Sequence, residues 1–341
     1  MKPSKSPTIY DVAARAGVSK SLVSLVLKGG RGVSDRRRRA VQSAIDELGY
    51  RPSAAATALA GNRTHTIGVL IDDYTNLWFV NMIRGMDEEL TGRRHSVVVA
   101  DLLLNAHLGR RPVEAFIGMR VDGLVLAAEP DPDLVDLLTD AGRLVIPTVV
   151  AGGRAAKLPG ADVVAVDELV GARLAVDHLI SLGHTAIAHL TGGGGSAANR
   201  RAGYEVAMTE AGLAPSVFRG KLATTEENGY RATHALLQRL PGTTAIFAAN
   251  DSMAAGSVAA LRERGLAQPG GISVVGFDDS PLAASRLVDI TTISDRGSEV
   301  GAHAVRALLK RIADPACLTS TELVAPELVV RSSSGWGSTR S

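Results

Sequence analysis

The sequence predicts two kinds of fold in one chain, a small all-α head followed by a larger α/β body in two lobes. Residues 8–33 hold two short helical patterns of apolar residues separated by a three-residue break. From residue 66 onward, short apolar runs rich in Val and Ile alternate with helical patterns, as in parallel sheets covered by helices. These runs form two series that start near residues 66 and 163, so we expect two lobes.

Gly17-Val18-Ser19 separates the two helical patterns of the head. Gly17 can adopt the left-handed conformation that ends a helix, and the Ser19 hydroxyl can cap the next one. Two helices that meet across such a short turn form a helix-turn-helix, whose second helix fits the major groove of DNA.

The charge distribution agrees with a DNA-binding head. Residues 1–65 hold 12 Lys/Arg and 4 Asp/Glu, whereas the rest of the chain holds 25 and 31. A basic head suits a polyanion. The candidate phosphate contacts are Lys20, Lys28, Arg31, Arg36–Arg39 and Arg51. The run Arg36–Arg39 can equally be the solvated face of a third helix, and both interpretations can hold together.

The body is expected to contain alternating elements that follow one another by right-handed crossovers. The expected strands, each a short apolar run, are Ile67–Ile71, Val97–Ala100, Gly123–Ala127, Leu144–Val150, Val163–Val166, 185–190, 217–223, 244–249 and 272–277. The expected helices, each with apolar residues at helical spacing, are Phe79–Leu90, 107–119, 133–141, 168–182, 198–212, 228–239, 252–264. Ligands of such folds bind at the carboxyl ends of the strands.

Other features restrict the class of protein. No apolar run approaches the ~18–20 residues that span a bilayer, and the N-terminus MKPSKSPT lacks the apolar segment of a secretory signal. Cys317 is the only cysteine, and no Cys/His cluster with metal-ligand spacing stands out. No nucleophile–base pair is visible either. We therefore expect a cytoplasmic protein without membrane segment, metal, cofactor or catalytic residues.

The head resembles the DNA-binding head of the lactose/galactose repressor family of bacterial transcriptional regulators. The resemblance rests on the order and spacing of Thr8-Ile9-Tyr10-Asp11-Val12-Ala13, Ala16-Gly17-Val18-Ser19, Val23-Ser24, Val33-Ser34, Glu47-Leu48-Gly49-Tyr50-Arg51-Pro52 and Leu59-Ala60-Gly61. It implies that the body is similar to the two-lobed sugar-binding proteins of the periplasm, hinged around a cleft.

The resemblance implies a division into parts. These are a helix-turn-helix head (1–52), a hinge helix and linker (53–65) and a body (66–331) with lobe 1 at about 66–161 and 292–320 and lobe 2 at about 162–291 and 321–331. The last ten residues, 332–341, are rich in Ser and Gly and predict a disordered tail.

In the second helix of the head, Lys20, Ser21 and Leu25 occupy the face that reads base edges. The family commonly has Arg at the place of Leu25, where it reads guanine. Leucine can contact only apolar surface such as a thymine methyl, so Lys20 remains the candidate for a guanine contact; Leu25 can instead be a core residue. The expected DNA-contacting residues of the head are Thr8, Tyr10, Ser19, Lys20, Ser21, Ser24, Leu25, Lys28 and Arg31.

The segment after Pro52 is Ala-rich but too short to be a stable helix alone. The resemblance implies a hinge helix that forms on the operator and enters the minor groove, where Leu59 wedges between base pairs. Ser53 and Ala56 belong to the same contact set, although the family usually has Asn at the place of Ser53. Leu59 can alternatively be the first core residue of the body.

Several residues at strand ends are expected to bind a small effector. Asn76-Leu77-Trp78-Phe79 follows the first strand, and the rings of Trp78 and Phe79 suit the apolar face of a sugar or base, unless they are core residues of the next helix. Arg200 begins an Arg-x-x-Gly-aromatic pattern, and the family's ligand-clamping arginine falls on it. Its guanidinium offers several donors.

Three further residues complete the expected effector set. The family's ligand carboxylate falls on Asp278, and Asn250, after another strand, can both donate and accept. Asp72 can supply an acceptor or be a solvent-facing loop residue. Asp251 is expected only to cap its helix. The run Gly192–Gly195 is interpreted as a loop at the mouth of the cleft, because it lacks a phosphate-binding signature.

These features together predict a sequence-specific DNA-binding regulator, a repressor, that binds double-stranded operator DNA as a homodimer or a dimer of dimers. A sugar or sugar-like polyol between the lobes would control its operator affinity. The alternatives are a purine- or nucleoside-responsive regulator of the same architecture, and then a sugar-binding protein or an enzyme.

Overall fold

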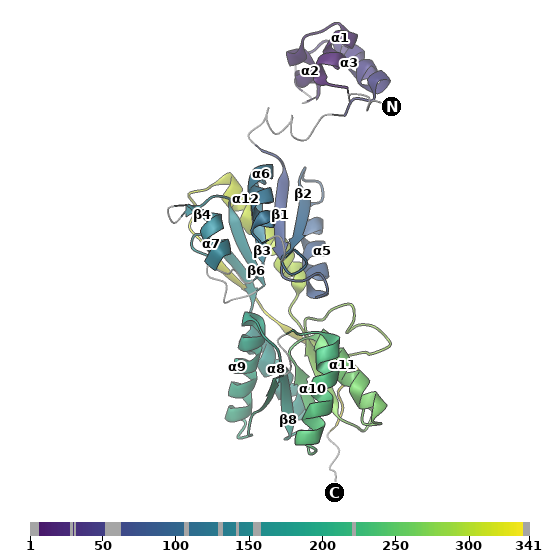
Figure 1. Cartoon of the computed structure of the whole chain (residues 1–341), viewed down its shortest axis with the longest axis vertical. Helices are drawn as coiled ribbons and strands as arrows, with labels where there is room; N and C mark the ends of the chain where they lie inside the picture. Colours follow the sequence, from purple (N-terminus) through teal and green to yellow (C-terminus); the bar gives the residue numbers. More distant parts are fainter. Residues whose placement is uncertain are drawn as a thin grey trace. The chain divides into compact units, whose positions relative to one another are not determined.

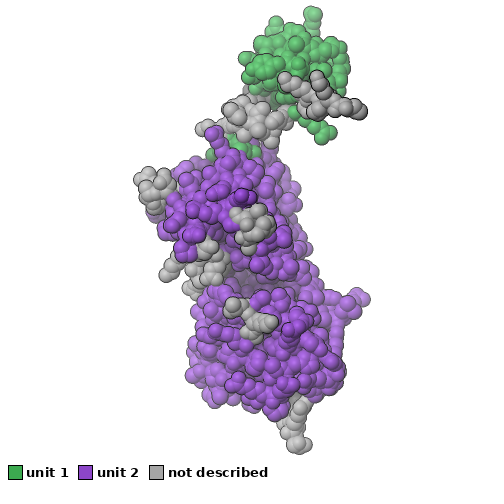
Figure 2. Space-filling model, in the orientation of Figure 1, with its two compact units in different colours: residues 1–64 green, residues 65–341 purple. Residues whose placement is uncertain are grey.

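The computed structural model describes residues 7–27, 30, 32–51, 63–105, 109–128, 132–140, 143–152, 158–219 and 223–336. The chain forms two compact units, residues 1–64 and 65–341, which Figure 2 shows in different colours. Five expected DNA contacts lie outside the described residues, namely Lys28, Arg31, Ser53, Ala56 and Leu59.

The first unit contains the expected helix-turn-helix. Its helices are α1 (Ile9–Ala16), α2 (Lys20–Leu27) and α3 (Asp35–Leu48). Gly17 has a φ of 64° and ends α1 in the left-handed conformation, and Leu22 N donates to Ser19 Oγ at 3.3 Å at the start of α2. The core of this unit consists of Val12, Ala13, Val23, Val26, Val41, Ala44 and Tyr50.

The arginine run lies on the first turns of α3. Arg36, Arg37 and Arg39 are exposed, so both interpretations of this run remain open. Arg38 is half-buried and its Nη2 donates to Gly30 O at 2.9 Å. This arginine therefore holds Gly30, which lies between α2 and α3.

The second unit contains two six-stranded sheets with helices packed on their faces (Figure 1). The first sheet is parallel, with the order β13-β7-β6-β3-β1-β2. Its strands are β1 (Thr66–Ile71), β2 (Ser96–Asp101), β3 (Gly123–Ala127), β6 (Thr148–Gly152), β7 (Asp162–Val166) and β13 (Thr321–Val324). The helices of this lobe are α5 (Trp78–Leu90), α6 (Arg111–Met119), α7 (Pro132–Leu138) and α12 (Gly297–Ala313), with a short hairpin of β4 (Thr139–Asp140) and β5 (Arg143–Leu144).

The second sheet has the order β14-β12-β11-β10-β8-β9, in which only β14 is antiparallel to its neighbour. Its strands are β8 (Ile187–Thr191), β9 (Ser216–Arg219), β10 (Ala245–Ala248), β11 (Ser273–Phe277), β12 (Thr291–Ser294) and β14 (Glu327–Val329). Its helices are α8 (Glu168–Ser181), α9 (Gly195–Glu210), α10 (Glu226–Arg239) and α11 (Asp251–Glu263).

Helices cover both faces of the central strands, which explains why β3, β8, β10 and β11 are buried along their whole length. In the first lobe, Val69 and Val125 pack toward α5 and α12, whereas Leu70 and Leu126 pack toward α6 and α7. The period of two along each strand produces this alternation. No helix in the described part of the chain is long and apolar enough to cross a membrane.

The lobe boundaries expected from the sequence need correction. Strand β7 at 162–166 lies in the first sheet, as does β13 at 321–324, whereas β12 at 291–294 lies in the second. Asp162 holds β7 in place because its carboxylate accepts from Arg311 Nε of α12 at 2.5 Å and from Ser320 N at 2.7 Å. The chain therefore crosses between the lobes after β7, after β12 and after β13. Alternation of strands and helices cannot show which sheet a strand joins.

The expected disordered tail is wrong for residues 332–336. Ser333 is buried, and its Oγ donates to Val274 O at 2.7 Å while it accepts from Thr291 N at 2.8 Å. The His184 ring bonds Thr244 Oγ1, Ser273 Oγ and Gly335 O, each at 3.0 Å, in keeping with the structural role that its buried position indicates. Ser333 and Gly335 therefore form hydrogen bonds beside the start of β11, and residues 332–336 are an ordered segment.

The other elements differ from the expectation mainly at their ends, by one to three residues. Three differences are larger, and one of them is that the strand expected over 217–223 ends at Arg219. The helix expected from 107 begins at Arg111, and the strand expected over Leu144–Val150 is divided into β5 and β6. Pro147 lies at that break, where a residue without a backbone N–H cannot continue a central ladder.

Candidate functional site

A cavity of about 190 Å³ lies between the two lobes, at the carboxyl ends of the strands of both sheets. The first lobe contributes Asp72, Asn76, Trp78, Phe79, Ala127, Ala128, Ala151, Gly152 and Val166. The second contributes Gly193–Ala197, Arg200, Thr224, Ala249, Asn250 and Asp278. Glu168 and Asp295 line it at two of the three crossings between the lobes. All six residues expected to bind an effector therefore lie in the wall of one cavity.

Arg200 of α9 is the centre of the polar wall. Its Nη1 donates to Asp278 Oδ1 at 2.9 Å and to Ala249 O at 2.7 Å, and its Nη2 lies 3.6 Å from Glu168 Oε1. The guanidinium also lies over the Phe277 ring, 3.8 Å from the centroid. Among the described residues, the buried Nε of Arg200 has no hydrogen-bond partner.

Carboxyl groups outnumber this cation. Asp278, Glu168 and Asp295 are all buried, and each lines the cavity with Arg200. Burial raises the pKa of Asp278 to about 6 although the Arg200 charge opposes the rise. Burial, and next the Asp278 charge, also raise the pKa of Asp295. The described part of the wall therefore holds three buried carboxyl groups beside one guanidinium.

The structure corrects the role expected for Asp251. Asn250 is the N-cap of α11, because its Oδ1 accepts from Met253 N at 2.9 Å, while its Nδ2 donates to Thr224 O at 3.1 Å. Asp251 instead accepts from Ser280 N at 2.7 Å and from Thr292 Oγ1 at 2.6 Å. It ties the loop after β11 to β12 and holds the neighbouring Asp278 indirectly.

The aromatic residues serve the core and the cavity at once. Trp78 and Phe79 are 8% and 5% exposed, belong to the core of the first lobe and line the cavity, so the two interpretations are compatible. Their rings meet edge to face at 5.1 Å. Gly152, with a φ of +96°, leaves room for Trp78, since a Cβ there would lie 2.6 Å from Trp78 Cη2.

The sequence analysis missed Glu168 and Asp295 as cavity residues. Both follow apolar strands almost directly, which is the signal that could have identified them. Asp72 is exposed and lines the cavity, whereas Asp73 accepts from Thr75 N at 2.8 Å and closes a turn. Gly193–Gly195 line the cavity where α9 begins, which agrees with their expected place at the cleft.

The head presents its expected contacts outward. Thr8, Tyr10, Ser19, Lys20, Ser21 and Leu25 are exposed, and Ser24 is half-buried. Lys20 Nζ donates to Tyr10 OH at 3.2 Å and so joins the two helices on this face. Leu25 is 40% exposed and outside the core of the head, which disfavours its interpretation as a core residue. Thr8 is the N-cap residue of α1, and its backbone N and its hydroxyl both donate to Asp11 Oδ2 at 2.7 Å.

Comparison with known proteins supports this combination of head and body. Residues 8–53 match the description "Bacterial regulatory proteins, lacI family", and residues 176–334 match a periplasmic binding protein-like domain. The ribose operon repressor of Escherichia coli K12 is 34% identical over 336 residues, which cover 96% of this chain and 99% of that repressor. The chain belongs to the lacI family.

Other lacI-family proteins are similar to this chain in sequence and in structure. The repressor PurR of Erwinia tasmaniensis is 35% identical over 341 residues, 96% of each chain. The lac repressor dimer bound to operator and the anti-inducer ONPF has a TM-score of 0.84 and 28% identity, over 97% of this chain and all of that one. A family member from Enterococcus faecium with bound ribose has a TM-score of 0.67 and 27% identity, over 79% and 98%. This lacI-family protein is a DNA-binding transcriptional regulator with an effector-binding body, and not an enzyme.

Proposed function

We propose that this lacI-family regulator is a repressor whose effector is a small neutral sugar or polyol held between the lobes by Arg200 and Asp278. The observation that carries the proposal is the 2.9 Å pair of these two side chains in the cavity wall. A guanidinium beside a carboxylate offers donors and acceptors together, which is what vicinal hydroxyls require. Asn250 and Asp72 add polar groups, and Trp78 and Phe79 supply apolar surface.

The charge of the cavity favours a neutral ligand rich in donors. Among the described residues, its wall holds the carboxyl groups of Asp72, Glu168, Asp278 and Asp295 and one cation, Arg200. An anionic ligand would meet repulsion there. A purine presents ring nitrogens that need donors, and part of the donor capacity of Arg200 and Asn250 is taken by Ala249 O and Thr224 O. We therefore rank a purine effector below a neutral sugar or polyol. The volume of about 190 Å³ also suits a small ligand, since drug-sized pockets have roughly 300–1,000 Å³.

The relatives point to the same class. Ribose is named for one relative's operon and is the ligand bound to one similar structure. Ribose is accordingly the first compound to test on this chain.

The regulatory step would use the crossings between the lobes. Glu168 and Asp295 lie where the chain passes from one lobe to the other, and both line the cavity. A ligand that bonds both lobes would therefore change their relative angle. In a homodimer, or a dimer of dimers, this change would alter the spacing of the two heads on a near-palindromic operator. The coupling is reciprocal, so operator DNA also changes effector affinity.

On the DNA, Lys20 would read a base edge, with Ser21 and Leu25 beside it. The other contacts would be to the backbone from Thr8, Tyr10, Ser19, Ser24, Lys28 and Arg31 and to the minor groove from Ser53, Ala56 and Leu59. The protein would act in the cytoplasm, associated with the nucleoid when it is bound to its operator.

A thermal-shift screen of the full-length chain against sugars, polyols and nucleobases tests this proposal. We expect ribose or a related polyol to raise the unfolding temperature of the wild type and not that of Asp278→Asn. A shift by nucleobases alone would establish the purine-responsive alternative. A shift that Asp278→Asn retains in full would place the ligand elsewhere.

A further inference from the structure

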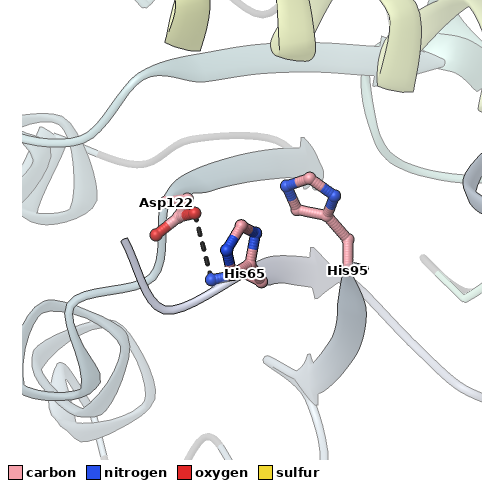
Figure 3. A group of neighbouring side chains, drawn as sticks. All are labelled: His65, His95 and Asp122. Carbon is pink, nitrogen blue, oxygen red and sulfur yellow. Dashed lines mark hydrogen bonds between the residues drawn. The ribbon is translucent and has the colours of Figure 1, made fainter. Parts of the chain in front are cut away.

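Three possible metal ligands lie at the end of the first sheet where its parallel strands begin. The effector cavity lies at the other end, where these strands finish. His65, His95 and Asp122 immediately precede β1, β2 and β3. These strands are neighbours in the order β3-β1-β2, so parallel pairing brings together residues that are 30 and 27 positions apart in the sequence. Figure 3 shows the two imidazoles beside each other, with the Asp122 carboxylate reaching the His65 backbone.

The backbone holds this group in place. His65 O accepts from Ser96 N at 2.8 Å, and Asp122 N donates to Thr66 O at 2.8 Å. His65 N donates to Asp122 Oδ2 at 3.1 Å. His65 itself has a φ of 52°, a conformation that a non-glycine residue adopts only when its surroundings enforce it. Each ligand is thus attached to the start of a rigid strand.

The donor set suits a transition metal. One ligand atom from each side chain lies within 4.8 Å of the others, and the two rings meet edge to face at 5.2 Å. Tetrahedral zinc with bonds of about 2.0–2.2 Å places its ligand atoms about 3.3–3.6 Å apart. Rotation of the exposed His65 and of the half-buried His95 and Asp122 side chains can close that difference. Imidazole favours zinc and similar ions over Mg²⁺ or Ca²⁺.

We propose that His65, His95 and Asp122 form a binding site for a divalent transition-metal ion of the zinc class, with a fourth position open to water. The site contains the residue at which the chain enters the body unit. A bound ion would cross-link that residue to the starts of β2 and β3. No local sequence pattern predicts the site, because only the register of three parallel strands assembles it.

Titration of Zn²⁺ into the tag-free, chelator-stripped full-length chain tests the proposal, with Co²⁺ absorption as a second readout of the ligand set. We expect one Zn²⁺ per chain, not displaced by excess Mg²⁺. His65→Gln, His95→Gln and Asp122→Asn should each weaken binding at least about 10-fold, since even outer-shell changes cost that much. Asp122→Asn keeps an oxygen that can accept from His65 N, so the local fold survives.

His303→Gln is the matched control, because His303 pairs with Glu322 and belongs to no group of three possible ligands among the described residues. Cys317→Ser controls for the free thiol. Both should bind Zn²⁺ as the wild type does. The proposal is overturned if the wild type binds no stoichiometric Zn²⁺, if the three site variants retain its affinity, or if either control loses binding equally. Thermal unfolding of each metal-free variant separates loss of a ligand from loss of the fold.

Discussion

The Arg200 guanidinium and the Asp278 carboxylate, 2.9 Å apart, join helix α9 to the end of strand β11 in the wall of the interlobe cavity. Asp278 reaches this position with a φ of 107°, a strained conformation for a residue with a side chain. Its N donates to Ile293 O at 2.8 Å, which ties the bend to β12. A strained backbone conformation of this kind persists where the surrounding structure enforces it. Here it places the Asp278 carboxylate in the cavity wall.

Removal of the Arg200 charge should affect both stability and effector binding. Arg200→Met keeps much of the side-chain volume but leaves buried carboxyl groups without their cation. We expect a loss of about 3 kcal/mol in the free energy of unfolding, measured by urea denaturation, and no thermal shift with sugar. Arg173→Met removes an exposed partner of Glu210 in the same lobe and should leave both quantities unchanged. Equal effects of the two variants would show that the buried pair has no special role.

Gly152 should be required for the aromatic side of the cavity. Gly152→Ala adds a Cβ 2.6 Å from Trp78 Cη2, so the indole must move and effector affinity should fall. Gly183→Ala is the control, because Gly183 also has a positive φ, +81°, but has open space around it. Both variants should lose roughly 1 kcal/mol or more of stability from backbone strain. Only Gly152→Ala should change the binding isotherm, and an identical change in the control would refute the contact.

The ion pair of Asp162 and Arg311 should make stability depend on pH in a predictable direction. Burial acts to raise the pKa of Asp162, but hydrogen bonds from Arg311 and Ser320 hold it below its ordinary value. The native state therefore binds this proton less readily than the unfolded chain does. The contribution is fully present above about pH 4, the ordinary pKa of Asp, and is lost as the pH falls through the lower native value.

Asp162→Asn should accordingly cost about 3 kcal/mol at pH 7, because Arg311 is then buried without its carboxylate. The gap between wild type and variant, measured by urea denaturation, should narrow as the pH falls below about 4. A gap that stays constant over this range would contradict the assignment.

Two substitutions in the head should separate base contacts from phosphate contacts. Lys20→Ala should weaken specific operator binding by roughly 1–3 kcal/mol and leave binding to random DNA much less affected. Equal losses on both DNAs in an anisotropy titration would make Lys20 a phosphate contact. Leu25→Arg should change the preferred half-site, which a selection from random sequences would reveal.

Much of the fold and of the cavity follows from local sequence patterns. The glycine and serine of the turn at 17–19 predict the helix-turn-helix. Asn250 and Asp278 each follow a strand, which predicts polar groups at the carboxyl ends of the strands. The two-lobed architecture also agrees with the comparisons.

The remaining features depend on long-range pairing that a local pattern does not encode. β7 joins the first sheet beside β6, and β13 pairs with β7 although the two are far apart in the sequence. Arg311 of α12 holds Asp162 at the start of β7. Glu168 and Asp295 line the cavity because the chain crosses between lobes at those points. His65, His95 and Asp122 meet only through strand register.

The most direct test of effector control is the affinity of the full-length chain for the DNA upstream of its own gene, with and without the sugar that the thermal-shift screen identifies. We expect saturating sugar to change the dissociation constant by about 5–150-fold, the usual range of allosteric coupling, and Asp278→Asn to bind the same DNA with no response to sugar. An operator affinity that the sugar leaves unchanged in the wild type, or changes equally in Asp278→Asn, would contradict the account.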